Sequence, residues 1–181
     1  DALPIWRPTP PVTTLLIHDE AGRELKTGEV GEICIKGPTI MKGYWNRADA
    51  TEDAIRNGFF HTGDAGYFDE DGFLYIHDRV KDMIVSGGEN VYPAEIEARY
   101  GDHPAIREIA VIGVPDERWG ETGRAHVVLE AGAETNSEAL EAWGRERLAR
   151  FKIPSDWVFE RNLPKTASGK IQKHKLQAAA G

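Results

Sequence analysis

The chain has 181 residues, a length that suits one domain or a small domain joined to part of another. Its 30 acidic and 22 basic residues give a formal net charge of -8, which argues against a nucleic-acid-binding protein but leaves nucleotide binding open. The hydrophobic fraction of 40% is typical of a folded globular protein, and no apolar run approaches the roughly 18 residues of a membrane span.

The single cysteine, Cys34, stands in an apolar run and predicts a buried structural thiol rather than a disulfide. This cysteine usage is typical of a reducing compartment, so we expect a cytoplasmic protein. Residues 1–6 fit poorly with the rest of the chain and resemble a translated sequencing adapter. We therefore expect residues 1–11 to be disordered or not native, and the chain to be a fragment.

The first part of the chain predicts strands and one short helix. Runs of β-branched and apolar residues predict strands at 12–18 and 30–36. A helix is expected at 48–56, where Asn57-Gly58 breaks it. A β-hairpin is expected over 64–77, because the acidic turn 69–72 separates two β-type runs.

The second part alternates strands and helices, which predicts a compact α+β domain of about 100 residues. Strands are expected at 83–85, 109–114, 125–130 and 157–160. One helix is expected to begin at Pro93, and another after a capping box at 135–138. The second helix carries a stripe that we expect to lie in the core: Leu140, Trp143, Arg147, Leu148 and Phe151. Gly144 is expected to weaken that helix by roughly 1 kcal/mol relative to alanine.

Two short stretches end in charged residues that could bind a ligand. Thr62-Gly63-Asp64 ends in a carboxylate, whose two acceptor oxygens match the two donors of a vicinal diol. Ser168-Gly169-Lys170 ends in an ammonium that could lie between two anions. Taken alone, the first also suits an ordinary turn and the second a solvated basic tail. The second is not a phosphate-binding P-loop, because Pro164 and Ile171 occupy positions that require glycine and serine or threonine.

A third stretch, Asp78–Asn90, joins charged residues, a short apolar strand and a glycine pair, as a hinge would. Together with the residues up to Glu97, it resembles the hinge motif of the adenylate-forming superfamily, which holds acyl-CoA synthetases, adenylation domains of peptide synthetases and beetle luciferases. Residues 62–64 and 163–171 resemble two further motifs of that superfamily. The likeness runs over roughly residues 12 to 177 and is strongest to fatty-acyl-CoA synthetases.

The resemblance implies a fold as well as a family. The expected fold class is α+β, with residues 1–78 as the β-rich end of a large N-terminal domain and residues 79–181 as a small lid domain. Residues 28–33 and 43–45 look like another superfamily motif, for which we expect turns and an aromatic plug. His61 is assigned to packing.

The resemblance also implies the roles of seven residues. Lys170 would bridge the acid's carboxylate and the α-phosphate of ATP, Asp64 would accept from both ribose hydroxyls, and Arg79 would reach the ribose or a phosphate. The lid would rotate about Asp78 as a hinge and present a short loop to the pantetheine arm of coenzyme A: Gly87, Gly88 and Glu89. No metal-ligating residue is assigned.

The leading hypothesis is an ATP-dependent acid–CoA ligase that forms an acyl-adenylate and then an acyl-CoA thioester, releasing pyrophosphate and AMP. Its expected cofactors are ATP, Mg²⁺ and coenzyme A, and its expected partner is a small carboxylic acid, without nucleic acid. An adenylation domain that loads a carrier protein stays open, and so does a non-catalytic nucleotide- or CoA-binding module. Because the superfamily's phosphate loop and acyl pocket lie outside this chain, we expect the chain alone to be inactive. The sequence does not identify the acid or the oligomeric state.

Overall fold

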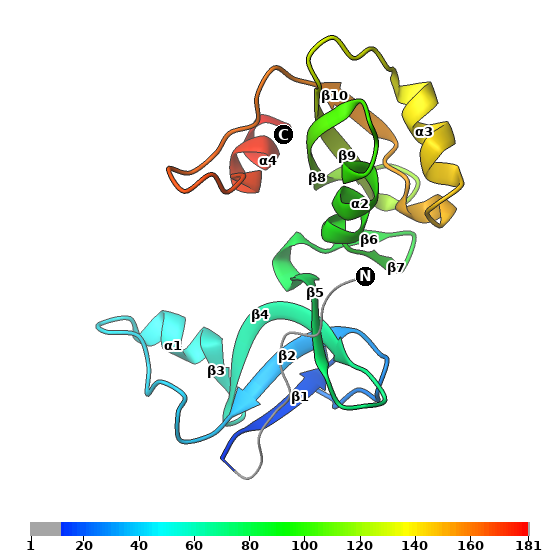
Figure 1. The fold of residues 1–181 in the computed structure, drawn as a ribbon. Helices are drawn as coiled ribbons and strands as arrows, with labels where there is room; N and C mark the ends of the chain where they lie inside the picture. Colours follow the sequence, from blue (N-terminus) through cyan, green and yellow to red (C-terminus); the bar gives the residue numbers. More distant parts are fainter. Residues whose placement is uncertain (1–11, 181) are drawn as a thin grey trace. The chain divides into compact units, whose positions relative to one another are not determined.

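The structure is a computed structural model that describes residues 12–180. The described chain forms two compact units that divide between Lys81 and Asp82. Strands dominate the first unit, whereas the second mixes strands with helices (Figure 1), which confirms the α+β fold class. Within the described residues, no helix is long and apolar enough to cross a membrane. The expectations for residues 1–11 lie outside the described residues.

The first unit is an antiparallel sheet with the order β1-β2-β4-β3, in which β5 also pairs with β4. Its elements are β1 (Thr14–His18), β2 (Gly31–Lys36), α1 (Ala48–Ala54), β3 (Ile55–Arg56), β4 (Phe59–Phe68) and β5 (Leu74–Arg79). The predicted strands and the 64–77 hairpin are present. The predicted helix ends earlier than expected, because Ile55 and Arg56 pair with Phe60 and Phe59 as β3.

Asn57 and Gly58 explain this change. Both residues have positive φ angles, of 53° and 78°, as in the tight turns that join two antiparallel strands. Asn-Gly is the pair that such a turn favours, because its two central residues must both adopt left-handed backbone angles. The pair therefore makes a β-hairpin between β3 and β4 rather than only ending a helix.

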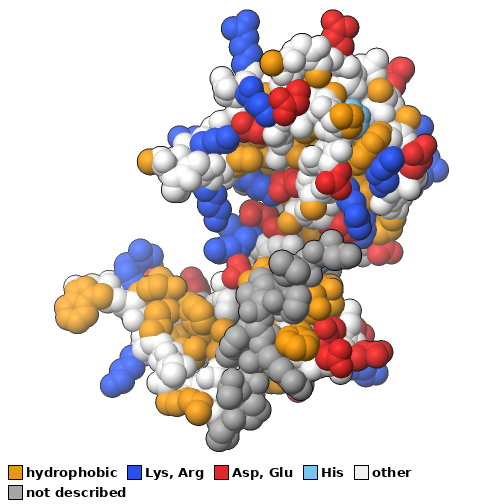
Figure 2. All heavy atoms as spheres, in the orientation of Figure 1, with side chains coloured by type: hydrophobic (Ala, Val, Ile, Leu, Met, Phe, Trp, Pro, Cys, Tyr) orange, Lys and Arg blue, Asp and Glu red, His pale blue; other side chains and the backbone are white. Residues whose placement is uncertain are grey.

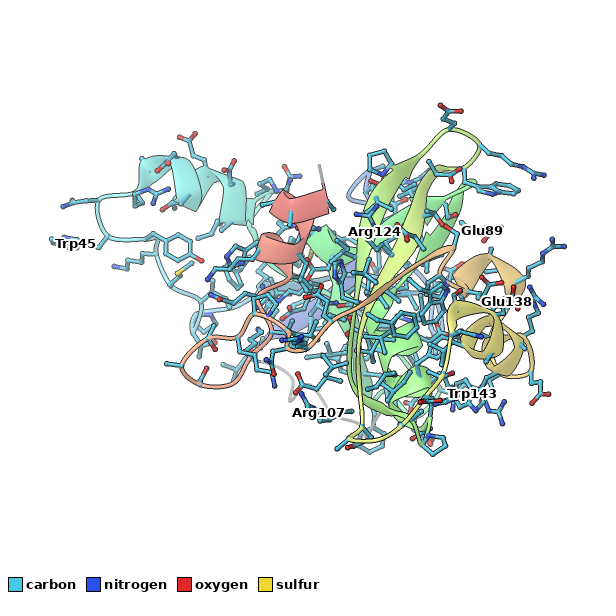
Figure 3. The ribbon with its side chains drawn as sticks, turned by 90° about the horizontal axis from the view of Figure 1, so that it is seen from above. Trp45, Glu89, Arg107, Arg124, Glu138 and Trp143 are labelled. Atoms are coloured by element: carbon cyan, nitrogen blue, oxygen red, sulfur yellow. The ribbon has the colours of Figure 1, made fainter. Side chains whose placement is uncertain are left out.

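The sheet of the first unit carries an apolar cluster. Alternate residues of its strands form an apolar cluster on one face: Leu15, Ile17, Ile33 and Leu74. Cys34 is fully buried and not disulfide-bonded, as predicted. The aromatic plug expected at 43–45 is not seen in the described part of the chain, since the Trp45 side chain is 90% exposed and points away from its loop (Figure 3).

The second unit is organised by a long hairpin of β8 and β9. Their register runs from Ile106 opposite Leu129 to Asp116 opposite Gly120, so both strands are longer than predicted. The sheet has the order β10-β9-β6-β7, with β10 parallel to β9 and β8 on the other edge of β9. Its strands are β6 (Ile84–Ser86), β7 (Glu89–Val91), β8 (Ile106–Asp116), β9 (Gly120–Leu129) and β10 (Asp156–Phe159).

Helices cover both faces of this sheet: α2 (Pro93–Gly101), α3 (Ser137–Arg145) and α4 (Lys173–Ala180) (Figure 1). One core holds residues of α2 and α3 against β8 and β9: Ile96, Tyr100, Val111, Val127 and Leu140 among others. A second core lies on the opposite face, under α4: Ala110, Ile112, Val114, Val128, Leu163 and Leu176. Successive side chains of β8 point to opposite faces of the sheet, so Val111 lies in the first core and Ile112 in the second.

Helix α3 differs from its prediction at both ends. The Asn136 side chain caps it by accepting a hydrogen bond from the Ala139 amide at 2.9 Å, so the expected capping box starting at Thr135 is wrong. The helix ends at Arg145, and the predicted core residue Phe151 is 45% exposed. Buried Leu140 and Leu148 and partly buried Trp143 confirm their predicted places in the core. Arg147 is exposed, so its predicted place in the core is wrong.

Gly144 is a packing position rather than a weak point of α3. A Cβ atom built there would overlap the hydroxyl group of buried Tyr100 and lie 2.9 Å from its Cζ. The same hydroxyl donates a hydrogen bond to the Leu140 carbonyl at 3.1 Å. The expected gain from alanine is therefore wrong for this position, because the steric conflict outweighs helix propensity.

Gly144→Ala should lower the free energy of unfolding by about 1 to 3 kcal/mol, as overpacking of a core does, although alanine is the better helix former by about 1 kcal/mol. Urea unfolding followed by tryptophan fluorescence would measure this change. Gly101→Ala is the matched control, because nothing lies within 4 Å of a Cβ built at the end of α2. A Gly144→Ala protein as stable as the unchanged chain would contradict this account of the packing.

Candidate functional site

The Thr62-Gly63-Asp64 motif forms a bulge in β4. Opposite β2, the pairing steps from Glu32–Ala65 to Cys34–His61, so three residues of β4 face one residue of β2. The Thr62 hydroxyl donates to the Ile33 carbonyl at 2.8 Å and accepts from the Asp64 amide at 3.1 Å. These bonds fix the bulge, which re-aims a side chain out of the regular sheet as bulges near active sites do.

Glu32 holds the base of this bulge. Its Oε1 accepts from the Gly63 amide at 3.1 Å, and its Oε2 accepts from His61 Nδ1 at 2.7 Å. Arg56 adds a looser ion pair to Oε2 at 3.7 Å. The sequence indicates a structural motif around Glu32 and a packing role for His61, but it does not reveal that both side chains support the neighbouring Thr-Gly-Asp bulge.

Among the described residues, one cluster has the spacing to hold a metal ion. The potential ligand atoms of Glu32, Cys34 and His61 all lie within 4.8 Å of one another. Thiol and imidazole donors suit a softer ion such as Zn²⁺ and do not suit Mg²⁺, which prefers oxygen ligands. Burial, followed by the Glu32 carboxylate, raises the pKa of the Cys34 thiol to about 11. The cluster is therefore a satisfied hydrogen-bond network around a protonated thiol and does not fit the Mg²⁺ ion that the resemblance implies.

Three of the predicted site residues lie together where β4 meets β5. Asp64 is directly opposite Arg79 in the strand register, and Arg79 Nε lies 2.8 Å from Asp64 Oδ1. Asp78 accepts a hydrogen bond from the Arg79 amide through its own Oδ1 at 2.7 Å. The Asp64 side chain is 31% exposed, so an acceptor group and a guanidinium stand side by side at the surface of the first unit.

Gly87 and Gly88 form the two-residue turn between β6 and β7. Their φ angles of 60° and 87° are the left-handed values that a tight hairpin turn requires, and Ser86 pairs with Glu89 across it. The Gly87 amide donates to the Trp119 carbonyl at 2.9 Å. A Cβ built at Gly87 would lie 2.8 Å from the Trp119 ring. This position therefore needs glycine, because a side chain would fit neither the space beside the ring nor the positive φ angle.

Lys170 lies on a small hairpin in which Lys165 pairs with Ile171 in antiparallel register. Thr166 and Gln172 donate through their amides to the carbonyls of Lys170 and Pro164, each at 2.8 Å. The Thr166 hydroxyl accepts from the Lys170 amide at 3.1 Å, and Gly169 closes the turn with a φ of 86°. The motif thus builds its own rigid turn, and the side chain of Lys170 is exposed.

The predicted residues therefore fall into two groups. Asp64, Asp78 and Arg79 belong to the first unit, whereas the glycine turn with Glu89 and the Lys170 hairpin belong to the second. Figure 2 shows Lys and Arg side chains intermixed with Asp and Glu over the visible face of the second unit, and Lys165 and Lys173 are each paired with a glutamate. The predicted roles of these residues stay predictions.

Replacing Glu32 should loosen the bulge. In Glu32→Ala, the Gly63 amide should exchange with solvent faster, and the free energy of unfolding should fall by about 1 to 3 kcal/mol because partly buried donors lose their acceptor. Hydrogen exchange followed by NMR would measure the first effect and urea unfolding the second. Glu20→Ala, at an exposed position, is the control and should change neither. Unaltered exchange at Gly63 would show that Glu32 does not hold the bulge.

Two family models match the sequence. The model described as AMP-binding enzyme matches residues 3–45, and the model described as AMP-binding enzyme C-terminal domain matches residues 95–170. The chain is 48% identical over 169 residues to a long-chain-fatty-acid–CoA ligase of Bacillus subtilis, which covers 93% of this chain and 30% of that protein. It is 45% identical over 170 residues to the fatty acid–[acyl-carrier-protein] ligase ScoC of Streptomyces coeruleorubidus, covering 94% of this chain and 33% of that protein.

Solved structures agree with these matches. The o-succinylbenzoate CoA synthetase MenE of Bacillus subtilis, in complex with an acyl-adenylate intermediate, superposes with a TM-score of 0.83 at 41% identity, over 92% of this chain and 34% of that chain. A further structure of that enzyme contains ATP and a magnesium ion. The chain spans about a third of the length of the relatives that it matches. Two family models and relatives that align along nearly its whole length show that the chain belongs to the AMP-binding, or adenylate-forming, enzymes.

Proposed function

We propose that this chain is part of an ATP-dependent acid–CoA ligase and supplies groups for both of its half-reactions. The observation that carries the proposal is the Lys170 hairpin, which holds an exposed ammonium on a turn fixed by its own hydrogen bonds. ATP, Mg²⁺ and coenzyme A are its proposed cofactors, and a small carboxylic acid is its proposed substrate.

In the first half-reaction a carboxylate oxygen of the acid attacks the α-phosphorus of ATP, and pyrophosphate leaves. Two anions must approach each other, and the Lys170 ammonium offsets their repulsion and stabilises the charge that develops on the departing phosphates. The Asp64 carboxylate accepts from the ribose hydroxyls and so fixes the nucleotide. The partial exposure of Asp64 on a fixed bulge supports this role. An acceptor held in place lowers the entropic cost of bringing the nucleotide into the reactive geometry.

In the second half-reaction the sulfur of coenzyme A attacks the acyl carbonyl, and AMP leaves. The Gly87-Gly88 turn is proposed to face the pantetheine arm, since a turn without side chains lets a thin ligand approach the backbone closely. The two poses require a rotation between the units. Asp78 lies just before the short 3-10 helix Val80–Asp82, and the units divide after Lys81, so we propose that the rotation is taken up between Asp78 and Lys81.

A carrier-protein ligase is the second candidate, and one observation favours it. A relative at 45% identity is named for ligating a fatty acid to an acyl-carrier protein. Both candidates share the adenylation step and differ only in the thiol that takes the acyl group, so the glycine turn would serve either thiol's pantetheine arm.

The function is tested with the longest reading frame that contains this chain, purified whole. It should release AMP only when ATP, an acid and coenzyme A are all present, in assays across short, medium, long and aromatic acids. The 181-residue chain alone should give no turnover, because it spans about a third of its relatives. Acid-dependent pyrophosphate exchange without AMP release on adding coenzyme A would favour the carrier-loading enzyme, and no acid-dependent exchange would overturn both.

Substitutions should separate the two half-reactions in that full enzyme. Lys170→Ala should lower the rate of ATP–pyrophosphate exchange by about 10²-fold or more, as loss of a transition-state charge does, and should spare thioester formation from added acyl-adenylate. Gly88→Leu should slow the thioester step more than adenylation, because leucine at a φ of 87° distorts the turn and blocks the backbone. Lys175→Ala, at an exposed position, is the control. Adenylation that survives Lys170→Ala would remove that lysine from the mechanism.

A further inference from the structure

The hairpin that carries Lys170 is held to the second unit at both of its ends. Leu163 before the hairpin and Leu176 after it are buried, and Ile171 packs against the same core on the α4 face. Apolar contacts of this kind keep a segment close to the sheet, but they are non-directional and fix its orientation only weakly. An exposed lysine at the far side of such a segment needs a directional restraint as well.

Two ion pairs supply that restraint, one on each arm of the hairpin. On the first arm, Lys165 Nζ lies 2.8 Å from Glu108 Oε2 at the start of β8. On the second arm, Lys173 Nζ lies 2.7 Å from Glu97 Oε1 of α2. The first contact is an ion pair rather than an aligned hydrogen bond, and Arg107 Nε also approaches Glu108, at 3.7 Å.

Glu97 does more than pair with Lys173. Its Oε1 also accepts a hydrogen bond from the Val111 amide at 2.7 Å. Among the described strands β8 pairs only with β9, so this amide lies on the outer edge of β8 and Glu97 covers it. One carboxylate therefore ties α2, the edge of β8 and the beginning of α4 together. The side chains of Glu97 and Lys173 are only 23% and 19% exposed, so solvent screens this pair less than a surface pair.

We propose that Glu97 and Glu108 are positioning residues for the adenylation step, because each holds one arm of the hairpin and together they set the direction of Lys170. This inference rests on the proposed function. In this proposal each carboxylate acts through the lysine that it pairs with and not by contact with substrate. Their loss leaves the Lys170 ammonium charged but lets its hairpin move, so the ammonium spends less time where the two anions meet, and small misplacements of a positioned group lower the rate of the chemical step.

The restraint is measured first in the 181-residue chain itself. Glu97→Gln and Glu108→Gln remove one charge each, and glutamine at position 97 keeps an acceptor for the Val111 amide. Solvent exchange of the Thr166 and Gln172 amides, followed by NMR, should accelerate about two- to fivefold in each variant, which is the range that loss of one such ion pair gives. Glu138→Gln is the matched control, because Glu138 lies exposed on α3, away from the hairpin (Figure 3). Exchange at both amides equal to that of the unchanged chain would overturn the proposal.

The consequence for the reaction is measured in the full enzyme. Each glutamine variant should lower the maximal rate of ATP–pyrophosphate exchange about two- to tenfold with little change in KM for ATP, since positioning and not nucleotide binding is lost. The reversed pair, Glu108→Lys with Lys165→Glu, should recover most of the rate. A loss that appears in KM alone, or a reversed pair no better than Glu108→Lys alone, would refute a positioning role.

Lys170→Ala and the two glutamine variants test the proposed function and the positioning role separately. If Lys170→Ala abolishes exchange while Glu97→Gln and Glu108→Gln keep the full rate, the positioning role fails and the proposed function stands. If Lys170→Ala keeps the full rate, the proposed function of Lys170 fails, whatever the hairpin amides do. Faster hairpin exchange together with lower adenylation in the glutamine variants would support both.

Discussion

The antiparallel ladder between β8 and β9 is the constraint on which the second unit depends. Its alternating side chains feed one core under α2 and α3 and another under α4, so neither core can shift without disturbing the other. The glycine turn and the Lys170 hairpin attach to this same sheet. The turn attaches through Trp119, the residue before β9, and the hairpin through Glu108 on β8. The ladder thus holds in place two loops that are proposed to serve different chemical steps.

In both units a glutamate carboxylate accepts a hydrogen bond from a backbone amide and so stabilises the local structure. Glu32 holds a bulge that aims Asp64, and Glu97 holds an edge amide together with a lysine beside the Lys170 hairpin. In each case a glutamate reaches a backbone amide that the regular sheet leaves without a strand partner, which is a favourable use of a group that only accepts hydrogen bonds. Glutamate side chains therefore support both Asp64 and the hairpin of Lys170, the residues proposed to bind the nucleotide and to act in adenylation.

The sequence was sufficient for the fold class, the family and most of the longer elements, because β-branched runs and an amphipathic stripe carry strong local signals. It failed where partners are distant: nothing local shows that Glu32 contacts His61 and Gly63, or that Tyr100 fills the space beside Gly144. The three residues of β7 and the eight residues of α4 show too little periodicity for the sequence to predict either element. The Asn57-Gly58 pair, in contrast, is a local signal for a two-residue hairpin turn as well as for the end of a helix.

The ion pair between Asp64 and Arg79 has a consequence for ligand recognition. If Asp64 accepts from a ribose as proposed, its Oδ1 is shared between the sugar and the Arg79 guanidinium. Dissolved salt screens a half-exposed ion pair but hardly affects hydrogen bonds to an uncharged diol. Moderate ionic strength would thus weaken the Asp64–Arg79 ion pair more than the proposed contact between Asp64 and the sugar.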